Sequence, residues 1–145
     1  MNNRNKRNLV RLAQYLIELS YVDFSMHTYL DYEGYSLEFI EFDDKKHECG
    51  SVGCCIGHSV LVHGMEYEKV KGLSATWRGY STNLFGFDEL DSEYGNYLFS
   101  PDWVDEDNTP IGAAKRIIAV LTDSDRSDYL SLDVSMLPSI ESYKD

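Results

Sequence analysis

Hydrophobic residues near the N-terminus recur at the spacing of one helical face. Leu9, Leu12, Ala13 and Leu16 fall at positions i, i+3, i+4 and i+7, and the polar residues Arg11 and Gln14 lie between them. A period of 3.6 residues places these side chains on one side of an α-helix. The pattern predicts an amphipathic helix that begins near residue 7, preceded by a flexible basic tail at residues 1–6.

Three later segments have the same helical spacing. Asn108 or Thr109 can cap a helix that starts at Pro110, because a proline in the first turn loses no hydrogen bond. Its expected apolar face is made of Ile111, Ala114, Ile117, Ile118 and Leu121. A second helix is expected to end at Gly86 and to carry Trp77, Tyr80, Ser81 and Leu84. A third, shorter helix is expected before Pro101 and carries Leu90, Tyr94, Tyr97 and Leu98.

The segment SVGCCIGHSVLVHG, residues 51–64, predicts one more helix. Ser51 is a good N-cap, and Val52, Ile56 and Val60 follow it four residues apart. Gly64 can end such a helix in the left-handed conformation. The cysteines in this segment then pack as small buried side chains.

Alternation typical of strands is confined to two short stretches. Leu37 and Phe39 stand on either side of Glu38, and Leu130, Leu132 and Val134 alternate with polar residues and could pair with the strand at 37–42. We therefore expect a mainly α fold, a compact single domain over residues 1–145. It should have about five helices, at most one small β-hairpin or sheet, and an acidic C-terminal extension at 124–145.

Composition is consistent with a folded protein that does not enter a membrane. The 145 residues are 43% hydrophobic and 13% aromatic, which is too apolar for a disordered chain. The longest apolar run, residues 117–121, is far shorter than the roughly 20 residues of a membrane span. The first helix lacks the continuous apolar core of a signal peptide. We expect a cytoplasmic protein that does not bind membranes.

Charge is distributed unevenly along the chain. The net charge is −12, yet Arg4, Lys6, Arg7 and Arg11 all lie in the first eleven residues, which contain no acid. Residues 12–145 therefore hold nine basic and 25 acidic side chains, a net charge of −16. Such a body repels nucleic acid and is attracted to basic protein surfaces. Solubility alone is the alternative explanation of this charge.

Twenty residues, 88–107, combine acids with aromatic side chains and contain no Lys or Arg. Carboxylates can steer a basic partner, and aromatic side chains can supply buried contact area. The predicted binding surface consists of Asp88, Glu89, Asp91, Glu93, Tyr94, Asp102, Trp103, Asp105, Glu106 and Asp107. In the alternative interpretation, Tyr97, Leu98 and Phe99 belong to the core and the acids occupy solvated turns.

The cysteines offer a second kind of chemistry. An odd count of three within seven residues does not suit a disulfide framework. His47, Cys49, Cys54 and His58 have the right donor types for zinc, although their spacing is looser than in most structural zinc sites. Cys49 could also act as a thiol nucleophile, with His27, His47 or His58 as its base. We favour packing, and expect no metal, no cofactor and no catalytic residue.

At CGSVGCCIGH the chain resembles a set of small uncharacterised proteins from bacteriophages and some bacteria. Their shared pattern is Cys-Gly-Thr/Ser-x-x-Cys-x-x-Gly, matched here by Cys49, Gly50, Ser51, Cys54 and Gly57. Similar flanking segments are DFSMHTY, FGF, YLFSPDW and NTPIGAAKRIIAVL, so the resemblance covers about residues 8–122. It implies a phage-encoded accessory protein in the host cytoplasm and transfers no functional residue.

Together these observations predict a non-enzymatic interaction protein. It would bind a basic surface of a host protein, and thereby inhibit a nucleic-acid-handling or anti-phage defence system, without contacting nucleic acid itself. The alternative is a metal- or thiol-dependent protein centred on Cys49, Cys54 and His58.

Overall fold

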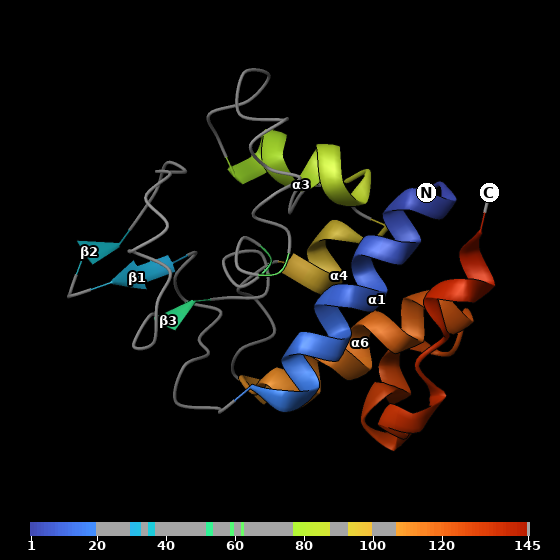
Figure 1. Ribbon diagram of the computed structural model, residues 1–145. Helices are drawn as coiled ribbons and strands as arrows, with labels where there is room; N and C mark the ends of the chain where they lie inside the picture. Colours follow the sequence, from blue (N-terminus) through green and yellow to red (C-terminus); the bar gives the residue numbers. More distant parts are fainter. Residues whose placement is uncertain are drawn as a thin grey trace.

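The structure is a computed structural model, and it describes residues 1–19, 30–32, 35–36, 52–53, 59, 62, 77–87, 93–99 and 107–144. These residues are mainly helical, which confirms the predicted fold class. The α-helices are α1 (Asn3–Glu18), α3 (Trp77–Phe85), α4 (Gly95–Phe99) and α6 (Pro110–Thr122). Three 3₁₀ helices follow, η4 (Arg126–Ser131), η5 (Val134–Met136) and η6 (Ile140–Tyr143). They pack beside α1 and α6, so the two chain ends lie close together (Figure 1).

Helix α1 begins four residues earlier than predicted. Asn2 and Asn5 form a reciprocal capping box: the Asn2 side chain accepts from the Asn5 backbone N–H at 2.9 Å, and Asn5 Oδ1 accepts from the Asn2 N–H at 3.2 Å. Residues 3–6 therefore belong to the helix, and the expected tail at 1–6 is wrong. The predicted apolar face is confirmed, because Leu9, Leu12, Ala13 and Leu16 are fully buried.

Helix α6 packs along α1 and has the predicted start. Thr109 is the N-cap, and its Oγ1 accepts from the Gly112 N–H at 3.0 Å. Asp123 ends the helix in the left-handed conformation, with φ 54°. Ala113, Ala114 and Ile117 join the core cluster that α1 also enters. Ile111 was expected in that face but is exposed, because the first turn of α6 turns it toward the C-terminal helices instead of α1.

Helix α3 ends at Gly86, as predicted, and the end is fastened to α1. Gly86 has a φ of 84°, a conformation that favours glycine, and a Cβ there would stand only 3.0 Å from Asn5 Oδ1. Asn5 and Asn8 both donate from Nδ2 to the Leu84 carbonyl, at 3.1 and 2.9 Å. These two buried side chains satisfy a carbonyl that the helix itself leaves open.

A small antiparallel sheet has the strand order β2-β1-β3, with β1 (Leu30–Tyr32), β2 (Tyr35–Ser36) and β3 (Val52–Gly53). The helix expected to begin after Ser51 is therefore wrong at its start. Val52 pairs with Asp31 and Gly53 with Leu30, and the extended conformation suits a β-branched residue in a ladder. Ser59 and Val62, further along, are helical. The strand expected at 37–42 lies outside the described residues.

The alternating stretch at 130–134 does not form the predicted strand. Leu130 belongs to η4 and Val134 to η5. Asp125, Asp133 and Ser139 each accept a hydrogen bond from the backbone N–H two residues later, at 3.0, 2.8 and 3.2 Å. Each of these bonds starts a tight turn, so local side-chain to backbone bonding replaces strand pairing.

Candidate interaction surface

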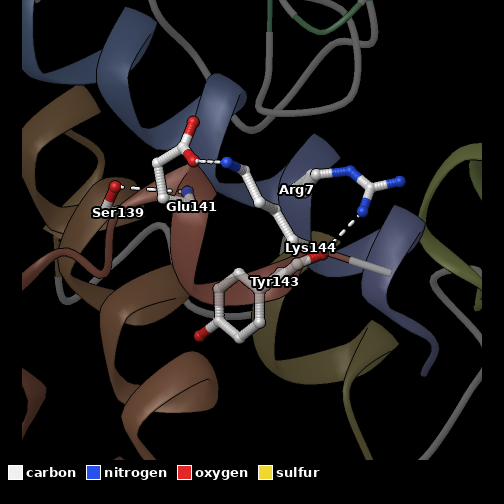
Figure 2. A network of polar contacts seen from close by, with 5 residues as sticks. All are labelled: Arg7, Ser139, Glu141, Tyr143 and Lys144. Carbon is white, nitrogen blue, oxygen red and sulfur yellow. Dashed lines mark hydrogen bonds and ion pairs between the residues drawn. The ribbon is translucent and has the colours of Figure 1, made fainter.

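Basic side chains of α1 contact the C-terminal residues and the end of α3. Arg7 donates to the Tyr143 carbonyl at 2.6 Å (Figure 2). Lys6 lies over the Tyr143 ring, at 5.4 Å from its centre. Arg4 donates at 3.1 Å to the carbonyl of Asn83, in the last turn of α3, where a cation is favourable. Positive charge that the sequence suggested for a free tail therefore has intramolecular contacts.

The last helix, η6, is held by contacts within its own segment and by contacts with α1. Glu141 accepts an ion-pair contact from Lys144, and its backbone N–H donates to Ser139 Oγ (Figure 2). Asn3 Nδ2 donates to the Lys144 carbonyl at 3.3 Å, which joins the two ends of the chain. The C-terminal extension at 124–144 is thus packed against the helical core instead of projecting from it.

Arginine and tyrosine side chains alternate where α4, α6 and η4 meet. The Arg116 guanidinium lies 4.8 Å from the Tyr97 ring centre and 4.3 Å from that of Tyr129. Arg126 lies over Tyr94 at 5.1 Å and over Tyr97 at 5.7 Å. Cation–π contacts of this kind are strongest where water is excluded, and Arg116 is only 5% exposed. We call these five residues the Arg–Tyr stack.

Tyr97 stands at the centre of the Arg–Tyr stack. Its hydroxyl donates to the Arg126 carbonyl at 2.9 Å, and its own carbonyl accepts from Arg116 at 3.0 Å. Burial raises the pKa of Tyr97 to about 12, while the nearby Arg116 opposes that shift. The Tyr129 hydroxyl is buried and has no hydrogen-bond partner among the described residues.

Of the ten residues of the predicted binding surface, the described ranges include Glu93, Tyr94 and Asp107. Glu93 is exposed, and its carbonyl accepts from Arg126. Tyr94 is half-buried and packs on Phe87 with ring centres 5.4 Å apart. A hydrogen bond with Glu93 raises the pKa of Tyr94. Tyr94 thus contributes to the core as well as to the surface.

Asp107 lies at the start of α6. Its carboxylate accepts from Thr109 Oγ1 at 2.6 Å, and a Cβ added at Gly112 would overlap it. A carboxylate in this place also stabilises the positive end of the helix dipole. The other seven members lie outside the described residues: Asp88, Glu89, Asp91, Asp102, Trp103, Asp105 and Glu106. The alternative interpretation assigned Tyr97, Leu98 and Phe99 to the core. Leu98 and Phe99 are buried in the core, as that interpretation predicted.

The structure adds a feature that the sequence analysis missed, an open groove of about 430 Å³ beside the first turns of α6. Lys115 is one of its lining residues, and its Nζ donates to the Leu130 carbonyl at 3.1 Å. We call it the α6 groove, and its lining consists of Ile111, Lys115, Leu130, Ser131, Leu132, Asp133 and Val134. The recurring Asp-x-Ser turns at 125–127 and 133–135 were the signal in the sequence that could have indicated it.

The zinc and thiol hypotheses concern residues outside the described ranges, namely His27, His47, Cys49, Cys54 and His58. Within the described part of the chain, no three His, Cys, Asp or Glu side chains gather closely enough to hold a metal ion. In the same residues, no helix has both the length and the apolar character required to cross a bilayer.

Comparisons with family models, curated proteins and solved structures gave no match. The similarity to small phage and bacterial proteins stays a prediction from the CGSVGCCIGH segment and its flanks.

Proposed function

We propose that this chain is an acidic, non-enzymatic interaction protein that binds a basic surface on a host protein. The observation that carries the proposal is the charge of the chain, −12 overall and −16 over residues 12–145, together with the contacts of the basic residues in α1. Arg4 and Arg7 donate to main-chain carbonyls, and Lys6 lies over an aromatic ring. These contacts leave the three side chains charged, and the net charge of −12, which includes them, favours a basic partner surface.

The partner chemistry follows from that charge. A basic patch that holds nucleic acid in the host protein would attract this chain, whereas nucleic acid itself would be repelled. We place the protein in the cytoplasm of a phage-infected bacterium, where blocking such a patch would inhibit a nucleic-acid-handling or defence system. The resemblance at Cys49–Gly57 supports the phage origin, and the acid-rich segment 88–107 is the predicted contact surface.

Affinity capture from a bacterial lysate tests the proposal. The full chain is used as bait at low salt, and retained proteins are eluted with increasing salt and identified by mass spectrometry. The proposal predicts a stoichiometric host protein that binds nucleic acid when alone and elutes as salt rises, because screening weakens contacts between exposed charges. If no protein is retained at low salt, or nucleic acid is retained in its place, the proposal is wrong.

A further inference from the structure

The α6 groove exposes apolar side chains, and hydrogen bonds fix the backbone that carries them. Leu130 is 56% exposed and Ile111 is 38% exposed, and both line the groove. Single exposed apolar residues are common, so it is the concave surface that these two share, with the charges beside it, that favours docking. The Lys115 bond to the Leu130 carbonyl and the Ser131 bond to the Asp128 carbonyl, at 3.1 and 2.8 Å, hold η4 in place.

Acidic side chains lie in this groove and on the segment next to it. Asp133 lines the groove, and Asp125 and Asp128 are exposed on the neighbouring η4 segment. Hydrogen bonds from Ser127 and Ser135 lower the pKa values of Asp125 and Asp133, so these two carboxylates stay ionised well below neutral pH. Lys115 is the basic residue of the lining, and its ammonium group already donates to the Leu130 carbonyl.

The charge selects among possible occupants. A second copy of this chain would bring another net charge of −12 to the same place, and like charges disfavour that contact. Lys115 is a nearby cation that, after the Ser135 hydrogen bonds, helps to lower the pKa of Asp133, and an apolar but uncharged segment would add no further positive charge for the exposed Asp125 and Asp128. A segment with apolar residues on one face and Lys or Arg on the other can contact both the apolar side chains of the groove and the carboxylates beside it.

We propose that the α6 groove docks a basic amphipathic helix of the partner protein. The apolar face of that helix contacts Leu130 and Ile111, and its Lys or Arg side chains face Asp133 and Asp128. Helices bound in grooves use anchors at i, i+3 or i+4, and i+7, and a volume of about 430 Å³ lies within the range of specific binding pockets. This inference rests on the proposed function, since it requires a basic partner, and it adds a second contact surface to the predicted one at 88–107.

The test uses a model helix as the probe. A fluorescently labelled synthetic peptide of leucine and lysine, with leucines at helical spacing, is titrated with the full chain and followed by anisotropy. A second peptide has the same composition in scrambled order. We expect the amphipathic peptide to bind about tenfold more tightly than the scrambled one.

Two variants assign that preference to the groove. Leu130→Ser should remove most of the preference without altering the net charge. Met136→Ser is the matched control, because Met136 is 46% exposed on the neighbouring η5 but does not line the groove. Ile111→Ser gives an independent second test from the α6 side of the lining, and circular dichroism melting checks that each variant is folded.

The possible outcomes distinguish a failure of the groove proposal from a failure of the proposed function on which it rests. Both peptides could bind equally, with an affinity that salt weakens but that Leu130→Ser and Ile111→Ser do not change. That result would contradict the proposed groove and would still agree with a basic partner. Absence of binding by either peptide at low salt would overturn both proposals. Loss of the preference in Leu130→Ser and its retention in Met136→Ser would support the groove.

Discussion

The guanidinium of Arg116 lies 4.3 Å from the ring centre of Tyr129, which joins α6 to the first of the C-terminal 3₁₀ helices. Tyr97 of α4 covers the same guanidinium at 4.8 Å and meets Tyr129 edge-on, at 88°. One arginine thus holds three separate elements together. The C-terminal extension depends on this contact and on the contacts with α1.

Replacing Arg116 tests the importance of the stack. Arg116→Met keeps an apolar stem but removes two cation–π contacts and the bond to the Tyr97 carbonyl, so we expect a loss of about 2–4 kcal/mol in the free energy of unfolding. Urea denaturation measures it. Lys115→Met, one residue earlier and partly exposed, should cost less than about 1 kcal/mol. Equal losses in the two variants would contradict the role assigned to Arg116.

Asn5 and Asn8 share one acceptor, the Leu84 carbonyl. Either side chain alone can satisfy this carbonyl, whereas removing both leaves it without these donors. We expect Asn5→Ala and Asn8→Ala together to destabilise the protein by about 1 kcal/mol more than the sum of the single changes. A double-mutant cycle by thermal or urea unfolding measures this coupling, and strict additivity would show that the two bonds are independent.

Stability should decline at alkaline pH because of Tyr97. Its pKa of about 12 in the folded protein exceeds the ordinary value of 10, so the unfolded chain loses this proton first. The contribution is fully present below pH 10 and is lost between about pH 10 and 12. Melting temperatures of the wild type and Tyr97→Phe should therefore converge over this interval. Parallel curves would mean that Tyr97 titrates normally.

The contact between Arg7 and Tyr143 predicts how readily the C-terminus is digested. Arg7→Ala removes the bond to the Tyr143 carbonyl, so carboxypeptidase should trim the chain faster. Arg11→Ala serves as the control, because Arg11 donates to Asn8 within its own helix, at 3.3 Å. The experiment compares trimming rates by mass spectrometry, and similar rates in the two variants would argue against this contact.

The helical core could be predicted because burial imposes a period on the sequence. Leu9 to Leu16 and Ala114 to Ile118 follow that period, and Thr109 with Pro110 marks a helix start that local chemistry alone determines. The start of α1 was missed because Asn5 replaces the usual Glu or Gln of a capping box.

Other features depended on contacts that the sequence does not display. Leu130 to Val134 alternate like a strand, yet the turns that begin at Asp125 and Asp133 fold them into 3₁₀ helices. Ile111 and Leu130, distant in sequence, meet only because η4 returns to α6, so the groove was not predictable from periodicity. Tyr94 was predicted as a docking residue from its acidic neighbours, and its packing on Phe87 became evident only in the fold.

The central claim is that acidic side chains of the segment 88–107 bind a basic partner. Asp102→Lys with Glu106→Lys changes the net charge from −12 to −8, and Glu18→Lys with Glu141→Lys makes the same change at exposed sites elsewhere. Asp107 is left intact because it contacts Thr109 at the start of α6.

The decisive measurement is the affinity of these two variants and the wild type for the captured host protein, at equal salt. The account predicts a loss of about tenfold or more for the variant at 102 and 106, and a much smaller loss for the variant at 18 and 141. Equal affinities for the two variants would contradict it, because net charge alone would then explain the binding.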